Sequence, residues 1–135
     1  MTFQARHQGI GGLVVDGSVR DSEEIRSSGF PCFARFVSPI GTAKNTIGSV
    51  NVPIQCGGVV VNPGDLVAGD DDGVVVVPRR AISEVIEKAR KRLEKEAKDR
   101  EQFKLGKTSM DLNPSFQKVL IESGVKQVES LKDVV

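Results

Sequence analysis

The hydrophobic period of the sequence changes at Pro78, and this change most limits what the chain can fold into. Before it, short apolar runs are separated by glycine, proline and aspartate; after it, from Arg79 to about Lys104, apolar residues recur every three or four positions. The first pattern predicts short β-strands and the second an amphipathic α-helix. We therefore expect an α/β protein in which residues 1–78 are mostly strands with one short helix, and residues 79–105 form a long C-terminal amphipathic helix.

The strand-rich part has recognisable boundaries. The apolar run GGLVV predicts a buried strand, and the acidic residues after Asp21 predict the start of a short helix, which Pro31 prevents from continuing. Either Asp21 or Ser22 could cap this helix. Later strands are expected on both sides of the glycine pair at 57–58, and as a hairpin whose turn falls in the aspartate run 70–72. That run lacks other ligands at a suitable spacing, so a turn is favoured over a metal site.

The predicted long helix has one apolar and one charged face. At about 1.5 Å per residue it would be longer than a small domain needs, so its far half should extend past the domain. Two interpretations stay open: this half packs on a neighbouring subunit, or it is a solvated and partly frayed helix end. A last short helix is expected over residues 114–123, with Phe116, Val119 and Leu120 facing inward. The apolar positions of the long helix are Ala81, Ile82, Val85, Ile86, Ala89, Leu93 and Ala97.

Composition argues against several classes of function. The chain has 135 residues, the size of one domain, and we expect a single domain over 1–135. It carries 19 basic and 18 acidic side chains and neither Trp nor Tyr, which argues against a nucleic-acid binder. No apolar run approaches the roughly 20 residues of a membrane helix, and no signal peptide is evident. Cys32 and Cys56 lack the spacing of a metal site or disulfide framework, and we expect reduced thiols in a cytoplasmic protein.

Arg20 and Asp21 stand side by side where the first strand gives way to a helix. An arginine guanidinium matches a carboxylate with two parallel hydrogen bonds, and an aspartate supplies oxygen ligands suited to Mg²⁺ or Mn²⁺. Together they could bind a small 2-oxo acid and a divalent ion. The alternative is a helix-capping aspartate beside a surface arginine, and the residues alone favour this alternative. His7, the only histidine, has no nucleophile in a recognisable setting, so a catalytic triad is not supported.

Three segments carry a resemblance to a known family: VDGSVRD at 15–21, the GT-K-T-G-VNVP block at 41–53, and CGGVVVNPGDLVAGDDDGVVVVP at 56–78. Together with the charged helix, they closely resemble the 4-hydroxy-4-methyl-2-oxoglutarate aldolase family, which also includes oxaloacetate decarboxylases and the regulator of ribonuclease activity A. The resemblance covers essentially the whole chain. It implies a β/β/α swivelling-domain sandwich that assembles as a homotrimer or hexamer, with the active site between subunits.

The resemblance also implies roles for individual residues. Arg20 would bind the carboxylate or keto oxygen of the substrate. Asp21 would hold a divalent metal, Mg²⁺ or Mn²⁺, partly through water. Thr42 and Lys44 fall in a stretch that lies near the site in the family.

A carboxylate on the long helix of a neighbouring subunit, Glu94 or Glu96, would complete the water shell of the metal by the same resemblance. One part of the family pattern is not found, a Gly-Asp/Asn-x-Leu loop that precedes the Arg-Asp pair and cradles the substrate carboxylate. Only nineteen residues precede Arg20. We therefore expect a member of the family that lacks its N-terminal part.

The expected function is a divalent-metal-dependent lyase. It would cleave 4-hydroxy-2-oxo acids to pyruvate, decarboxylate oxaloacetate, or do both, through a pyruvate enolate. Two alternatives stay open: a non-catalytic interaction protein that binds a ribonuclease, and an inactive truncated homologue. No side chain is an obvious general base. Neither a nucleic acid nor a membrane is expected as a partner.

Overall fold

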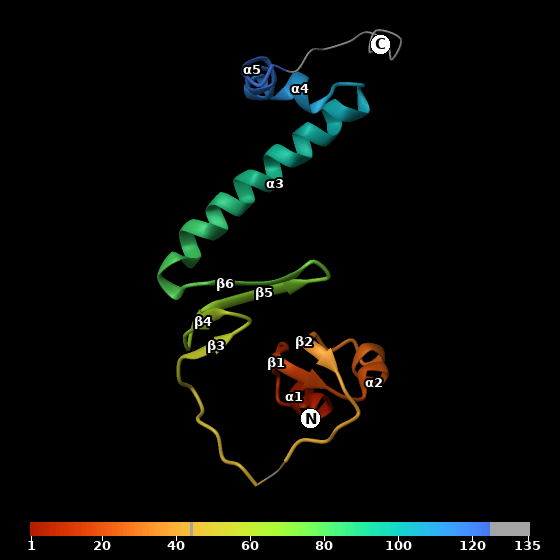
Figure 1. Cartoon of the computed structure of the whole chain (residues 1–135), viewed down its shortest axis with the longest axis vertical. Coiled ribbons are helices and arrows are strands. Elements are labelled where there is room, and N and C mark those ends of the chain that lie inside the picture. The colour runs from red at the N-terminus through yellow and green to blue at the C-terminus, as the bar shows by residue number, and fades with distance from the viewer. Residues whose placement is uncertain (44, 125–135) are drawn as a thin grey trace. The chain divides into compact units, whose positions relative to one another are not determined.

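The computed structural model describes residues 1–43 and 45–124 (Figure 1). By its internal contacts the chain divides into two compact units, residues 1–85 and the residues from 86 onward. The first unit contains the strands of the described structure, and the elements described in the second are helices.

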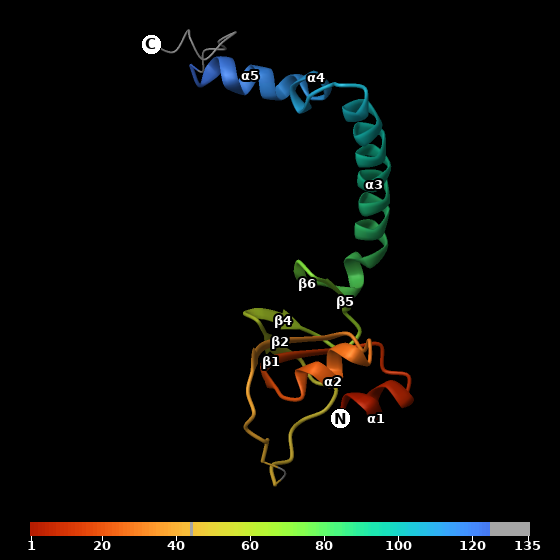
Figure 2. The ribbon, with the colours of Figure 1, turned by 90° about the vertical axis from the view of Figure 1, so that its right-hand side faces the viewer.

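The first unit begins with a helix and two parallel strands. α1 (Thr2–His7) leads to β1 (Leu13–Val19), α2 (Ser22–Ser27) follows, and β2 (Cys32–Val37) pairs with β1 in parallel. Parallel strands cannot be joined by a tight turn, so the chain must cross over, and α2 lies in this crossover beside the two strands (Figure 2). Gly29, at φ 66°, follows α2 in the left-handed conformation that commonly ends a helix.

Two antiparallel hairpins complete the strands. In the first, β3 (Ile54–Cys56) and β4 (Val59–Val61) are joined by Gly57 and Gly58. The φ angles of these glycines, 61° and 83°, are those that a two-residue hairpin turn requires at both positions. The sequence predicted this break from the glycine pair alone.

The second hairpin, β5 (Leu66–Asp70) and β6 (Gly73–Val77), has its turn in the aspartate run. The Phe33 ring of β2 packs onto Gly69 of β5, where an ideal Cβ would lie 2.6 Å from the end of the ring. A side chain at this position would force Phe33 to move. Glycine therefore allows β2 and β5 to approach each other.

Little of the described chain is buried. Phe30 is the only buried residue among those whose burial the structure describes. A hollow of about 440 Å³ lies between α2 and β2, bounded by Ile25 and Phe36 among others. At its edge, burial raises the pKa of the Cys32 thiol, which favours the protonated form.

The long helix expected after Pro78 is present. A 3₁₀ turn (Arg79–Ala81) leads into α3 (Ile82–Lys104). The Asp65 carboxylate holds the start of this segment, because its Oδ1 accepts a hydrogen bond from the Arg79 N–H at 2.9 Å and its Oδ2 one from the Asn62 N–H at 2.8 Å. One side chain thus joins the turn after β4 to the beginning of the helical segment.

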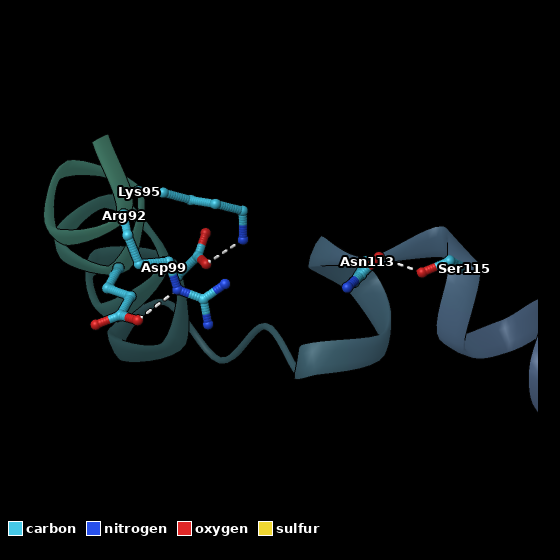
Figure 3. Close-up of polar contacts among 6 residues, drawn as sticks. Arg92, Lys95, Asp99, Asn113 and Ser115 are labelled. Atoms are coloured by element: carbon cyan, nitrogen blue, oxygen red, sulfur yellow. Dashed lines mark hydrogen bonds and ion pairs between the residues drawn. The ribbon is translucent and has the colours of Figure 1, made fainter. Parts of the chain in front are cut away.

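The two faces of α3 differ as the sequence predicted. On the charged face, Lys95 Nζ lies 2.7 Å from Asp99 Oδ2 and Arg92 Nε lies 2.6 Å from Glu96 Oε1 (Figure 3). None of the residues of α3 is buried, and Leu93, on the apolar face, is 61% exposed. Within the described structure, the apolar face of α3 is therefore accessible to solvent.

Two short helices complete the second unit, α4 (Ser109–Leu112) and α5 (Pro114–Glu122), which pack on each other. The inward orientation expected for Phe116 and Val119 is wrong, since they are 49% and 56% exposed, while Leu120 is partly covered. The physical reason is that α4 is a single turn, too short to cover the apolar face of α5. In the parts of the chain that the structure describes, no helix has the length and apolar character needed to span a membrane.

Candidate active site at the end of β1

Arg20 and Asp21 lie between the last residue of β1 and the first residue of α2. Arg20 Nε is 3.3 Å from Asp21 Oδ2, and each of the two side chains is 60% exposed. An ion pair this exposed is weak, because water screens it. Either group can therefore exchange its partner for a charged ligand at little cost.

Asp21 has a left-handed backbone, with φ 59° and ψ 39°. Its carbonyl accepts the first hydrogen bond of α2, from the Ile25 N–H at 3.0 Å, but its carboxylate makes no capping hydrogen bond. The side-chain capping that the sequence left open for Asp21 is thus not what the structure has. The left-handed conformation costs most L-residues about 1–2 kcal/mol and is better tolerated by aspartate. The carboxylate is directed to Arg20 instead of to the helix.

The chain passes Arg20 a second time after β2. The Ser38 N–H donates to the Val19 carbonyl at 2.9 Å, which extends the parallel pairing to the end of β1. A little further on, an ideal Cβ at Gly41 would lie 3.5 Å from Arg20 Nη1. The segment beginning at Gly41, which the resemblance placed near the site, therefore does approach the guanidinium at its first residue.

The remaining candidates are placed less directly. Thr42 follows this glycine and is exposed, so a role in substrate binding stays a prediction. Lys44 lies outside the residues that the structure describes. Glu94 and Glu96 lie on α3 in the second unit, where Glu96 is in an ion pair within its own helix. Their contribution to a neighbouring subunit stays a prediction as well.

Asp21 is the candidate metal ligand at this strand end. In residues 1–43 and 45–124, no three or more His, Cys, Asp or Glu side chains cluster in a way that could hold a metal ion. Mg²⁺ commonly keeps several water molecules and takes only one or two carboxylates from the protein. A single exposed aspartate fits such a water-rich ion.

One charged residue of this region was not among the predicted candidates. Asp16 lies inside β1, with Oδ1 2.5 Å from Arg35 Nε and Oδ2 accepting a hydrogen bond from the Gly57 N–H at 2.8 Å. The available signal was an acidic residue inside an otherwise apolar strand. Its partners come from distant parts of the sequence and depend on strand register, so the pattern alone did not identify them.

The described structure is that of an α/β protein with an exposed arginine–aspartate pair at the end of a strand. Residues 1–76 match the family model described as RraA-like, Aldolase/RraA. This match covers more than half of the chain, and the chain belongs to the RraA-like family. The resemblance stated from the sequence motifs is confirmed.

Relatives give the same family and show how much of it is present. An uncharacterized protein of Methanocaldococcus jannaschii is 40% identical over 111 residues, which cover 82% of this chain and 53% of that protein. The 4-hydroxy-4-methyl-2-oxoglutarate aldolase of Thermus thermophilus is 39% identical over 74 residues, 55% of this chain and 45% of the aldolase. The chain spans about half the length of these two relatives.

Solved structures support the fold. A protein of Pseudomonas syringae pv. tomato is similar with a TM-score of 0.74 and 35% identity, covering 80% of this chain and 55% of that one. RraAS2 of Streptomyces coelicolor, described as an unusual member of the RNase ES inhibitor RraA protein family, is similar with a TM-score of 0.62 and 33% identity, covering 75% and 54%. The predicted fold class, a mixed α/β sandwich of this family with a long C-terminal helix, is thereby confirmed.

Proposed function

We propose that the site at the end of β1 belongs to a divalent-metal-dependent lyase that forms pyruvate. Its substrates would be 4-hydroxy-2-oxo acids of the 4-hydroxy-4-methyl-2-oxoglutarate type, oxaloacetate, or both. The observation that supports this most is the exposed Arg20–Asp21 pair, 3.3 Å apart, with Gly41 beside the guanidinium. The aldolase name of the Thermus thermophilus relative supports the reaction class.

Both reactions leave negative charge on the C2 oxygen of a pyruvate enolate. In the aldol cleavage the C4 hydroxyl loses its proton, the C3–C4 bond breaks, and its electron pair forms the enolate. In the decarboxylation the bond to the departing carboxylate breaks, CO₂ leaves, and C3 then takes a proton. The two substrates therefore need the same stabilisation, at the same oxygen.

Arg20 is suited to this task because its guanidinium stays charged at all working pH values and offers paired donors. It would bind the substrate carboxylate or the C2 oxygen and stabilise the charge that develops there. Asp21 would hold Mg²⁺ or Mn²⁺, partly through water, and the ion supplies Lewis-acid polarisation of the 2-oxo group. The proposal assigns no general base to this chain.

The direct test is substitution of the pair. Arg20→Ala and Asp21→Ala should each lower pyruvate formation by about 10²–10³-fold or more, the usual cost of removing a preorganised charge stabiliser. Pyruvate release from oxaloacetate, and from 4-hydroxy-4-methyl-2-oxoglutarate, is followed with Mg²⁺ present. EDTA should stop the wild-type reaction, and added Mg²⁺ should restore it.

A matched control is the ion pair of Lys118 and Glu122 on α5, 3.8 Å apart. Lys118→Ala and Glu122→Ala should keep the wild-type rate. Wild-type turnover in Arg20→Ala or Asp21→Ala would refute the assignment of the site.

A second candidate function is that of a non-catalytic regulator that binds a ribonuclease. The likeness to RraAS2, at a TM-score of 0.62, supports it. Saturable binding of purified RNase ES, without pyruvate formation under the conditions above, would favour this candidate over the lyase.

The proposal includes assembly as a homotrimer or hexamer. It is supported by the open apolar face of α3, where Leu93 is 61% exposed. An active site shared between copies would bring a carboxylate of α3, Glu94 or Glu96, to the site of a neighbour.

A further inference from the structure

β1 carries one more residue than β2 along the same stretch of pairing. Val15 pairs with Ala34 and Ser18 pairs with Phe36, so the two residues 16–17 of β1 face a single residue of β2. This arrangement is a β-bulge. Bulges are rare between parallel strands, and they are over-represented next to active sites, where they redirect side chains.

The single residue opposite the bulge is Arg35, and Asp16 contacts it directly. Asp16 Oδ1 lies 2.5 Å from Arg35 Nε, while Oδ2 accepts the Gly57 N–H at 2.8 Å. The Asp16 side chain is 31% exposed, about half the exposure of Asp21. The side chain of Arg35 is 56% exposed, so water also screens this pair, and what ties the strands together is the contact geometry at the bulge with the Gly57 hydrogen bond. Asp16 thus connects β1, β2 and the β3–β4 turn at the bulge.

The register of β1 against β2 decides what lies opposite Arg20. Beyond the bulge, Val19 pairs with Val37, and its carbonyl accepts the Ser38 N–H at 2.9 Å. Arg20, the residue after Val19, therefore lies beside the segment that follows β2, and this segment brings Gly41 close to the Arg20 guanidinium. A slip of one residue would turn the later side chains of β1 to the opposite face.

We propose that the Asp16–Arg35 pair is a register lock, which holds the bulge of β1 and thereby positions Arg20 and Asp21. Asp16 is a positioning residue that acts through β1 and does not touch the substrate. The functional consequence rests on the function proposed above. The lock itself is a structural property that can be measured without turnover.

Asp16→Asn is the first test, because it removes the charge that Arg35 contacts and keeps an oxygen that can accept from Gly57. We expect kcat/KM for oxaloacetate to fall by about 10²-fold, the cost of a ~1 Å misplacement of reacting groups. Arg35→Gln should have the same effect. The double variant should be no worse than either single one, since both break the same contact. Arg35→Lys keeps the charge and should recover part of the activity.

Asp65→Asn is the matched control for general loss of stability. Asp16 accepts one backbone N–H group, from Gly57, and Asp65 accepts two, from Asn62 and Arg79, at a place away from β1 and β2. Its substitution should lower the thermal midpoint and leave kcat/KM unchanged. Readouts free of turnover are hydrogen exchange at the Ser38 amide and the NMR resonance of the Gly41 amide. Asp16→Asn and Arg35→Gln should speed the exchange and shift the resonance, whereas Asp65→Asn should change neither.

The outcomes separate the two proposals. Unchanged Ser38 exchange and an unchanged Gly41 resonance in both Asp16→Asn and Arg35→Gln would overturn the lock, as would wild-type kcat/KM in both. If the wild-type chain forms no pyruvate, the proposed lyase function fails, and the exchange and resonance data still decide the lock. Should Asp16→Asn not fold, Arg35→Gln and Arg35→Lys carry the same measurements.

Discussion

Asp65 shows how one carboxylate can join two turns. It accepts hydrogen bonds from the Asn62 N–H and the Arg79 N–H, and these bonds, that of Asn62 first, hold the pKa of the Asp65 carboxyl below its ordinary value. The physical cause is that donors directed at a carboxylate favour its charged form. The Arg79 side chain also lies against Gly64, with its Cδ 3.3 Å from where a Cβ would be.

This geometry predicts a specific dependence on pH. A carboxyl whose pKa is lower in the folded chain stabilises the fold above its unfolded pKa of 3.8, and this contribution is lost as the pH falls through the folded-state pKa. At pH 7, Asp65→Asn should have a lower thermal midpoint than the wild type. The gap should narrow as the pH is lowered below about 4, which circular dichroism melts between pH 3 and 7 would measure. A gap that stays constant over this range would contradict the role of the charge, and Asp71→Asn, in the β5–β6 turn, is the control.

For single residues, the sequence suggested candidate site residues but did not predict their backbone conformations. The motif VDGSVRD, through its resemblance to the family, selected Arg20 and Asp21 as candidates, and their roles stay predictions. The left-handed backbone of Asp21 had no glycine to mark it, and aspartate commonly caps helices, so the local pattern pointed to a cap. The partners of Asp16 follow from a bulge, and a bulge is decided by how two strands pair, not by either strand alone.

The elements themselves were largely predictable because their signals are local. The glycine pair 57–58 and the aspartate run 70–72 mark hairpin turns through the backbone conformations that those turns require. The 3.6-residue period of apolar residues predicted α3, because this signal also lies within the element itself. Which strands pair, and that β1 and β2 run parallel, depends on contacts between distant segments. The approach of Phe33 to Gly69 is one of these contacts, and no local pattern contains it.

That approach gives a prediction for packing between the elements of the first unit. Gly69→Ala should destabilise the fold by about 1–3 kcal/mol, the usual cost of overpacking, because the new Cβ would lie 2.6 Å from the Phe33 ring. Urea unfolding measures the difference. Gly11→Ala, where nothing lies within 4 Å of an added Cβ, is the matched control. Gly69→Ala with Phe33→Leu should recover part of the loss, and a Gly69→Ala chain as stable as the wild type would show that the two strands are not in close contact.

For the molecule as a whole, the main finding is how much apolar surface stays open. Phe36 in the first unit is 63% exposed and Leu93 in the second is 61% exposed. The chain also spans only about half the length of its relatives. Periodicity predicted that α3 would have an apolar face, but not what covers it, because the sequence of one element does not identify a partner in another polypeptide.

The proposed assembly predicts the behaviour of one substitution on this face. Leu93→Glu should lower the mass of the particle in sedimentation velocity, because a charge replaces an apolar side chain that would be buried between copies. Lys98→Glu, on the charged face, should leave the mass unchanged. Circular dichroism checks that both variants keep the helix. If Leu93→Glu sediments as the wild type does, α3 is not part of the interface.

The hydrogen bond between Asp16 and Gly57 has a consequence for the order of folding. It joins residues 41 positions apart, whereas each hairpin closes across two residues. Short loops close faster than long ones, because less chain has to be ordered before the contact forms. We expect the two hairpins to form early and the β1–β2 pair to dock on the β3–β4 turn late. The charged pair at the end of β1 would then reach its final position among the last groups of the first unit, so that a nascent or partly folded chain has no competent site.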